Sequence, residues 1–187
     1  WFSNEKIDKD KISQLILRWN EIEVESDNYV SKHFGGTYFT TSNARKIGYI
    51  REEIENLTGE LNFREKAILI TSLLYAMDKV ANTVGHYDAY RRKLDSVKEI
   101  RLLVPEFNDA LNEGNRIFKE DANELVRKIR ADLVYIDTPY NSRQYGDAYH
   151  LLENIAEWKQ PEVTGVAKKM VNRNHLKSDY CTMKATN

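Results

Sequence analysis

Residues 132–140 read DLVYIDTPY, and this stretch decides the fold that we expect. Its apolar part, residues 133–136, is the most strand-like run of the chain. Continuous apolar runs are typical of strands in a parallel sheet, which is covered on both faces. The polar residues 137–140 follow at once, and ligands of open α/β sheets bind outside the carboxyl ends of the strands. The stretch therefore predicts a buried strand that ends in a functional loop, although Asp, Thr and Pro are also common in a plain strand-ending turn.

The neighbouring segments fit the same α/β fold class. Ile100–Val104 and Arg116–Lys119 are shorter apolar runs, and Ala122–Ile129 has helical character. The order of strand, helix and strand predicts a βαβ unit of an open α/β fold within residues 96–187. A further helix is expected after the loop, and the tail from Pro161 onward is expected to be irregular and basic. The apolar face of that helix comprises Tyr149, Leu151, Leu152, Ile155 and Trp158.

The first 95 residues are expected to form a separate, mainly helical region. Lys9–Ile22 carries apolar residues at helical spacing on one face. A second helix is expected to be capped at residues 42–43. Asn62 and Glu65 match a capping box for a third helix over about Phe63–Val80. The broad apolar surface of this third helix predicts burial on more than one side.

The composition is that of an ordinary globular protein: 41% of the 187 residues are hydrophobic, 30% are charged, and the net charge is -1. This charge does not exclude nucleic-acid binding, because a local basic patch can supply the phosphate contacts. Cys181 is the only cysteine, so no internal disulfide can form and we expect a reducing, cytoplasmic location. No apolar run approaches the roughly 20 residues that span a bilayer. The chain begins at Trp1 without a Met or a leader, so we expect it to start partway through a longer protein.

Residues 137–140 combine the groups that methylation of an exocyclic amino nitrogen requires. The lone pair of an adenine amino nitrogen is delocalised into the ring, so two acceptors that bind both amino protons make it a better nucleophile. The carboxylate of Asp137 and the backbone carbonyl of Thr138 can supply these acceptors, and Pro139 stiffens the loop. The target base must also leave the duplex stack, and Tyr140 offers an aromatic face worth about 1–3 kcal/mol per stacked base.

The stretch Leu133–Tyr145, LVYIDTPYNSRQY, resembles the catalytic motif region of Dam-like, alpha-group adenine-specific DNA methyltransferases. The resemblance extends to residues 149–158 and, more weakly, to residues 81–90. It implies a Rossmann-like fold that uses S-adenosylmethionine, with a mainly helical insertion that contributes to target recognition. It also implies that Asp137 binds the target amino group beside the methyl donor, and that Asp121 lies near the adenine of the donor. The implied partners are double-stranded DNA with a flipped adenine and a cognate restriction endonuclease.

Two features depart from the family pattern. Thr138 replaces the first proline of the usual Asp-Pro-Pro-Tyr motif, which keeps a backbone carbonyl but removes the fixed φ of proline. No glycine-rich donor loop follows a strand anywhere in the chain; Gly35 and Gly36 lie between expected helices. We therefore expect a partial catalytic domain whose isolated chain binds S-adenosylmethionine poorly.

Several polar side chains are candidates for DNA contacts. Arg143 is expected either to hold a phosphate or base edge or to pair with a neighbouring acid, and Tyr145 either to wall the base pocket or to pack in the core. The basic residues of the tail and of the stretch before residue 94 are expected either to approach the DNA backbone or to be solvated faces. These candidates are Lys168, Lys169 and Arg173 in the tail, and His86 and Tyr87 followed by Arg91, Arg92 and Lys93.

Two other classes of function stay open beside DNA methylation. One is a noncatalytic helical DNA-binding module derived from a methyltransferase, and the other is a methyltransferase that acts on RNA or on a glutamine amide. The four histidines and Cys181 show no metal-ligand spacing, so a metal site is not expected.

Overall fold

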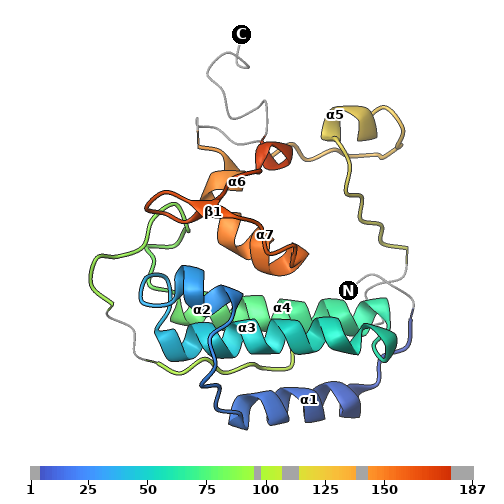
Figure 1. Ribbon diagram of the computed structural model, residues 1–187. Helices are drawn as coiled ribbons and strands as arrows, with labels where there is room; N and C mark the ends of the chain where they lie inside the picture. The colour runs from blue at the N-terminus through green and yellow to red at the C-terminus, as the bar shows by residue number, and fades with distance from the viewer. Residues whose placement is uncertain (1–4, 95–97, 107–113, 138–142, 178–187) are drawn as a thin grey trace.

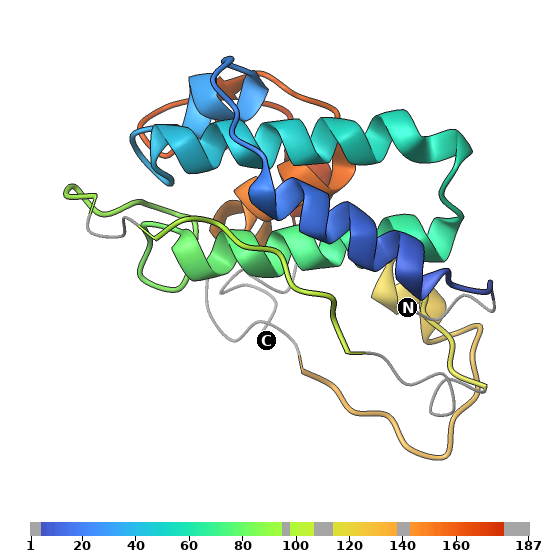
Figure 2. The same ribbon diagram turned by 90° about the horizontal axis from the view of Figure 1, so that it is seen from below.

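The computed structural model describes residues 5–94, 98–106, 114–137 and 143–177. Helices dominate its amino-terminal half: α1 (Lys9–Glu21), α2 (Tyr29–Phe34), α3 (Thr41–Asn56) and α4 (Phe63–Val80), with the short 3-10 helix η1 (Leu57–Gly59) between the last two. α3 and α4 run side by side as a central layer. α1 lies against one side of this layer, and α7 (His150–Glu157) lies against the other (Figures 1 and 2).

The helix starts are fixed by local side-chain hydrogen bonds. Asp8 caps α1 through the amide of Lys11. Asn62 and Glu65 form the capping box predicted for α4, whose bounds agree with the prediction. The cap predicted for α3 at residues 42–43 is wrong, because the Thr40 hydroxyl accepts from the Asn43 amide and begins the helix earlier. α2 was not predicted, and six residues are too few to show a periodic apolar pattern.

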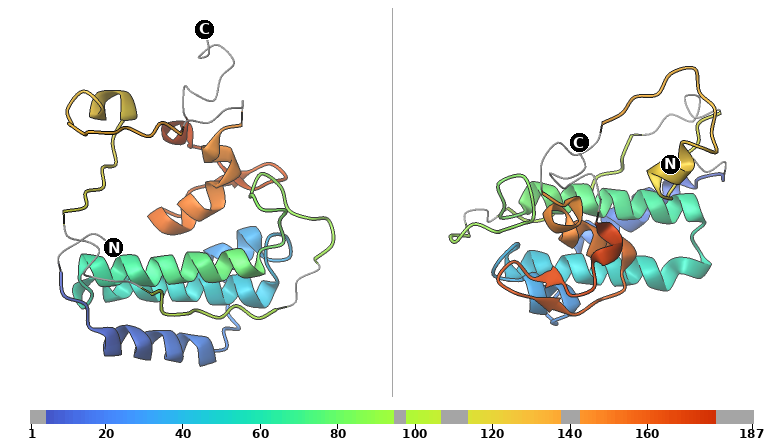
Figure 3. Two further views of the ribbon diagram at one scale, coloured as in Figure 1. Left: turned by 180° about the vertical axis from the view of Figure 1, so that it is seen from behind. Right: turned by 90° about the horizontal axis from the view of Figure 1, so that it is seen from above.

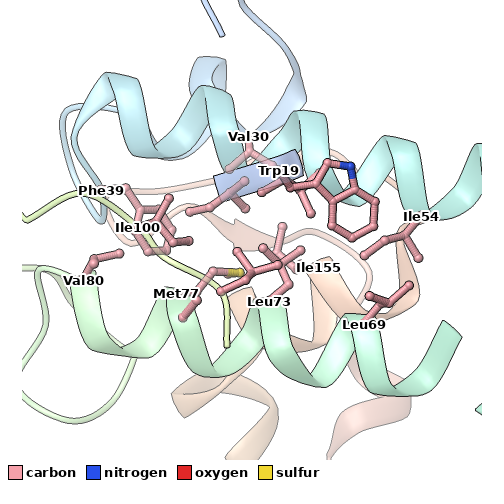
Figure 4. Packing of buried hydrophobic residues seen from close by; sticks show 14 of the residues in the cluster. Trp19, Val30, Phe39, Ile54, Leu69, Leu73, Met77, Val80, Ile100 and Ile155 are labelled. Atoms are coloured by element: carbon pink, nitrogen blue, oxygen red, sulfur yellow. The ribbon is translucent and has the colours of Figure 1, made fainter. Parts of the chain in front are cut away.

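The hydrophobic core lies between the helical layers (Figure 4). Trp19 of α1 is fully buried, and so are Leu73 of α4 and Ile155 of α7. The core continues past the boundary expected at residue 95, since Ile100 and Leu102 are each only 1% exposed. Residues from both expected regions therefore share one core.

The strand predicted at Ile100–Val104 does not form, and two asparagine side chains show why. The Asn43 amide donates to the Lys98 carbonyl and accepts from the Ile100 amide. Asn20 makes the same pair of bonds with the carbonyl and amide of Leu102. These side chains satisfy the backbone groups that a neighbouring strand would otherwise bind.

The strands predicted at Arg116–Lys119 and Asp132–Ile136 are also wrong for the described residues. Residues 114–137 run outside the helical core, and among them only the short helix α5 (Ala122–Leu125) is regular. Leu133 is 85% exposed and Ile136 75% exposed. A strand needs a hydrogen-bonded neighbour, and no described segment pairs with these residues. The described chain is thus mixed but mainly helical, without the expected βαβ unit.

The only sheet among the described residues lies in the tail that was predicted to be irregular. β1 (Val163–Thr164) and β2 (Lys169–Met170) form an antiparallel hairpin in which Val163 pairs with Met170. The hairpin lies beside α2 at one end of the molecule (Figure 3). It follows α6 (Tyr145–Ala148) and α7, and it precedes the 3-10 helix η3 (Asn174–Leu176).

Candidate active site and DNA interface

Asp137 is the one residue of the expected catalytic loop that the structure describes. It ends the exposed segment 114–137, and its side chain is solvent-exposed. Thr138, Pro139 and Tyr140 lie outside the described residues. The site can therefore be built only from Asp137 and from the elements that follow the loop.

Two tyrosines stand at the first helix after the loop. Tyr145 begins α6 and is 56% exposed, so it is not the core residue that was one of its two expected roles. Its ring lies 5.8 Å from the ring of Tyr149 at an interplanar angle of 80°, an edge-to-face arrangement. Arg143, two residues before α6, is also exposed. The exit of the loop therefore offers a cation and an aromatic pair to solvent.

Core packing and side-chain hydrogen bonds hold α7, the helix that follows this exposed tyrosine pair, in place. Leu151 and Ile155 are fully buried in the core. The Arg51 guanidinium donates from Nε to the Ile155 carbonyl at 2.8 Å and from Nη2 to the Ala156 carbonyl at 3.2 Å. These carbonyls belong to the last turn of α7, where helical acceptors have no partner within the helix. Arg51 thus fastens the end of α7 to α3.

The segment 82–94 is closed into a loop by Asn82. Its side-chain amide donates to the carbonyls of Thr37 and Arg91, each at 2.9 Å. Its backbone amide donates to the Tyr38 carbonyl at 2.8 Å, and its carbonyl accepts from the Arg91 amide at 2.9 Å. Asn82 is only 4% exposed. One buried side chain therefore fixes where both ends of the loop lie.

Tyr87, an expected DNA contact, lies in the core with 1% exposure. Its hydroxyl donates to Asp78 at 3.1 Å, and its backbone amide donates to the Ala148 carbonyl at 2.6 Å. Burial, with the charge of Asp78 adding to it, raises the pKa of the Tyr87 hydroxyl. Its neighbour His86 is half-buried. The Tyr87 ring faces the core, so it acts as an anchor between the loop and α6.

The expected basic candidates of the tail fall into two kinds. Lys169 pairs with Asp88 at 2.8 Å and with Asp147 at 3.3 Å, and Arg173 pairs with Asp147 at 2.6 Å. Burial alone would raise the pKa of Asp147, but the hydrogen bond from Arg173 and the charge of Lys169 outweigh it and lower the pKa. Lys168 instead lies in the hairpin turn and forms no ion pair with a described residue. Only Lys168 of the three leaves its charge uncompensated.

The two carboxylates expected beside the methyl donor, Asp121 and Asp137, are both solvent-exposed. Asp121 is the N-cap of α5, where it accepts from the amides of Asn123 and Glu124. One cavity of about 320 Å³ lies between Tyr29, Tyr49 and Trp158, and another of about 300 Å³ lies between α4 and residues 101–105. Neither cavity is lined by Asp121 or Asp137.

The described residues hold neither a metal-binding cluster nor a membrane-spanning helix. Among the histidine, cysteine, aspartate and glutamate side chains that the structure describes, no group is arranged to hold a metal ion. None of the described helices is long and apolar enough to cross a membrane.

Comparison with known proteins identifies the class. The chain belongs to the D12 class of N6 adenine-specific DNA methyltransferases, whose family model matches residues 3–184. No solved structure matches the chain.

Three relatives show how much of such a protein the chain represents. It is 40% identical over 169 residues to the modification methylase StsI of Streptococcus sanguinis, covering 87% of this chain and 26% of the relative. It is 39% identical over 142 residues to the modification methylase LlaI of Lactococcus lactis subsp. lactis, and the match covers 73% of this chain and 23% of the relative. It is 35% identical over 148 residues to the type II methyltransferase M.NlaIII of Neisseria lactamica, and the match covers 78% of this chain and 43% of the relative. The chain therefore spans about a quarter of the first two relatives and less than half of the third.

Proposed function

We propose that the protein to which this chain belongs transfers a methyl group from S-adenosylmethionine to the N6 amino group of adenine in DNA. The observation that carries the proposal is the family match over residues 3–184 together with the Asp-Thr-Pro-Tyr motif at residues 137–140. The relatives named as modification methylases support a cognate restriction endonuclease as a partner. A single cysteine and a DNA substrate fit a cytoplasmic location.

The proposed role of the motif is to bind and activate the target amino group. The carboxylate of Asp137 and the carbonyl of Thr138 accept one amino proton each, which pushes the nitrogen toward tetrahedral geometry. Tyr140 stacks on the adenine once it has left the duplex. The donor supplies an electrophilic methyl group on its sulfonium, so no covalent enzyme intermediate is needed.

The elements after the motif contribute the DNA side of the proposed site. Arg143 and the exposed ring of Tyr145 lie where the loop enters α6, so we assign them contacts beside the flipped base. Lys168 is assigned to the DNA backbone, with half-buried His86 a further candidate for contact. Tyr87, Lys169 and Arg173, which are buried or paired, are assigned to positioning the loop and the hairpin on α6.

The isolated 187 residues are proposed to bind S-adenosylmethionine weakly. Supporting this, Asp121 and Asp137 are both exposed and neither lines one of the two cavities. Isothermal titration of the chain with S-adenosylmethionine tests the proposal without any activity assay. Micromolar affinity would refute it.

The activity is tested on the full-length protein by transfer of a tritiated methyl group to duplex DNA. Asp137→Ala removes one acceptor, and loss of one such preorganised group typically lowers the rate about 100-fold or more. Asp132→Asn is the matched control, because Asp132 is an exposed carboxylate of the same segment. Full activity of Asp137→Ala would refute the site. Transfer to RNA or to a glutamine-containing peptide in preference to DNA would refute the substrate.

A further inference from the structure

Three segments that are distant in the sequence meet at one end of the molecule. α2, the loop of residues 82–94 and the β1–β2 hairpin lie together there in each view (Figures 1 and 3). The Tyr38 hydroxyl donates to the Ala167 carbonyl in the hairpin turn at 2.9 Å. The Tyr29 hydroxyl donates to the Pro161 carbonyl just before β1 at 2.6 Å. Asn82 joins the loop to Thr37, so the three segments are linked by direct hydrogen bonds.

Each of these segments brings basic side chains to this end. We call the set the cationic end face; it comprises Lys32, His33, Arg91, Arg92 and Lys168. Lys32, Arg91 and Arg92 are exposed, while His33 and Lys168 are half-buried. None of its lysines or arginines forms an ion pair with a residue that the structure describes.

Two aspartates carried by the same segments are already neutralised. Asp27, which precedes α2, pairs with Arg45 at 2.8 Å. Asp88 in the loop pairs with Lys169 at 2.8 Å. The positive charge of the cationic end face is therefore not cancelled by these acids.

The basic groups also repel one another. Burial lowers the pKa of His33, and the charges of Lys168 and Lys32 lower it further. Lys168 of the hairpin therefore lies close enough to α2 for its charge to act on His33. Like charges held together in this way are stabilised when a polyanion binds them.

We propose that the cationic end face binds consecutive phosphates of the DNA backbone and so sets how the duplex lies on the protein. The four charged groups and the neutral imidazole of His33, which can donate an N–H, come from three separate elements, which suits an extended polyanion better than a single small anion. The proposal rests on the proposed function, since it assumes a DNA substrate. It assigns contacts to Lys32 and His33, residues that carry no sequence motif.

An ion pair connects the hairpin of the face to α6, the first helix after the expected catalytic loop. Lys169, next to Lys168, pairs with Asp147 of α6 at 3.3 Å. α6 begins at Tyr145, directly after the catalytic loop. Phosphates held on the face would therefore be fixed relative to the loop exit, so that the face positions the duplex while Tyr145 and the motif act on the base.

The test compares two variants of the full-length protein that each remove two positive charges. Lys32→Gln with Lys168→Gln alters the face. Lys6→Gln with Arg18→Gln alters residues in or next to α1, on the far side of the α3–α4 layer (Figure 1). Binding to two duplexes of unrelated sequence is measured by fluorescence anisotropy over a range of NaCl concentrations. Thermal unfolding of both variants checks that they are folded.

The face variant is expected to bind both duplexes more weakly by the same factor. Each lost phosphate contact reduces the magnitude of the slope of log K against log salt concentration by about 0.9. At about 0.1 M salt, this change lowers the binding constant about eightfold. The variant should thus lose about 1.8 of slope and roughly 60-fold of affinity, while the α1 variant changes little. An unchanged slope, or an equal loss in the α1 variant, would overturn the proposal.

The same measurements separate this proposal from the proposed function. If the protein binds DNA through the face but transfers no methyl group to it, the proposed face is supported and the proposed methylation activity is refuted. A protein that methylates DNA with an unchanged salt slope in the face variant would refute the face alone.

Discussion

The ring of His150 is hydrogen-bonded through Nε2 to the backbone carbonyl of Tyr87 at 2.9 Å. A carbonyl can only accept, so the neutral imidazole carries its proton on Nε2. Its Nδ1 is buried and has no hydrogen-bond partner among the described residues. This bond joins the loop of residues 82–94 to the start of α7, the second helix after the expected catalytic loop.

Acid is expected to weaken this junction. Burial lowers the pKa of His150 to about 4; the bond to Tyr87 opposes the shift, and the charge of Lys169 adds to it. An unfolded histidine has a pKa of about 6.5, so between about pH 6.5 and pH 4 the unfolded state binds the proton more readily. The stability contributed by neutral His150 is therefore present above pH 6.5 and is lost as the pH falls toward 4. The full loss is about 3 kcal/mol.

His150→Gln checks the acid effect, because its amide can still donate to the Tyr87 carbonyl but cannot titrate. Urea unfolding at pH 7.5 and at pH 5 should show a smaller fall in unfolding free energy for the variant than for the wild type. Equal falls in the two proteins would show that another group is responsible.

Removing Arg51 is expected to release the end of α7. Its side chain is 2% exposed, and it also binds Glu55 at 2.9 Å. Arg51→Met leaves the carbonyls of Ile155 and Ala156 without their donors, which should lower the free energy of unfolding by about 2–4 kcal/mol. Arg45→Met on the same helix is the control. Its pair with Asp27 is half-exposed, so its loss should be within about 1 kcal/mol. Similar losses in chemical denaturation would contradict the role assigned to Arg51.

Gly48 is expected to be required for the packing of α2 on α3. A Cβ at this position would meet the side chain of Asn28. That side chain cannot move freely, since it caps the amides of Val30 and Ser31 and donates to the Arg45 carbonyl. Gly48→Ala gains about 1 kcal/mol of helix propensity but loses a cap and a part-buried hydrogen bond, together about 2–3 kcal/mol.

A net fall of about 1–2 kcal/mol in unfolding free energy is therefore expected for Gly48→Ala. Gly59→Ala is the matched control, because a Cβ there meets nothing within 4 Å. Thermal denaturation of both variants measures the difference. A Gly48→Ala protein more stable than Gly59→Ala would show that Asn28 moves aside easily.

Asn82→Ala is expected to open the loop of residues 82–94 without unfolding the helices. The change leaves the carbonyls of Thr37 and Arg91 without the side-chain donor. A fully buried group left unsatisfied costs about 1–3 kcal/mol, so these part-buried carbonyls cost less, and the cost falls on the loop. Amide hydrogen exchange should accelerate over residues 83–93 and stay unchanged in α1. Uniform acceleration along the chain would instead indicate a general loss of stability.

The sequence predicted the elements whose physics is local. The bounds of α4 agree with the prediction because Asn62 and Glu65 bind amides within one turn. α1 agrees within one residue because its apolar face repeats at helical spacing. The strand predictions were wrong because a strand forms only with a hydrogen-bonded partner strand, which can lie far away in the sequence. The alternation of buried Ile100 and Leu102 with exposed Arg101 fits a strand, but the partners of their backbone are asparagine side chains on α1 and α3.

The candidate site divides in the same way. The motif at residues 137–140 was readable because its chemistry is carried by consecutive residues. Lys168 and Lys169 are adjacent, and the sequence made both equal candidates for DNA contact. The tertiary structure gives them different surroundings. Only Lys169 meets Asp88 and Asp147, which lie 81 and 22 positions away along the chain. Tyr87 could not be recognised as a core residue because its neighbours Tyr38 and Asp78 come from other elements.

The sequence alone therefore predicted the proposed catalytic motif and determined the family to which its residues point and the helices that begin with their own caps. The tertiary structure alone decided which polar side chains are buried or paired and which remain exposed for the proposed DNA contacts. The reason is the distance along the chain over which each interaction acts. Capping bonds and helical periodicity act over a few residues, whereas burial and ion pairing depend on segments that only folding brings together.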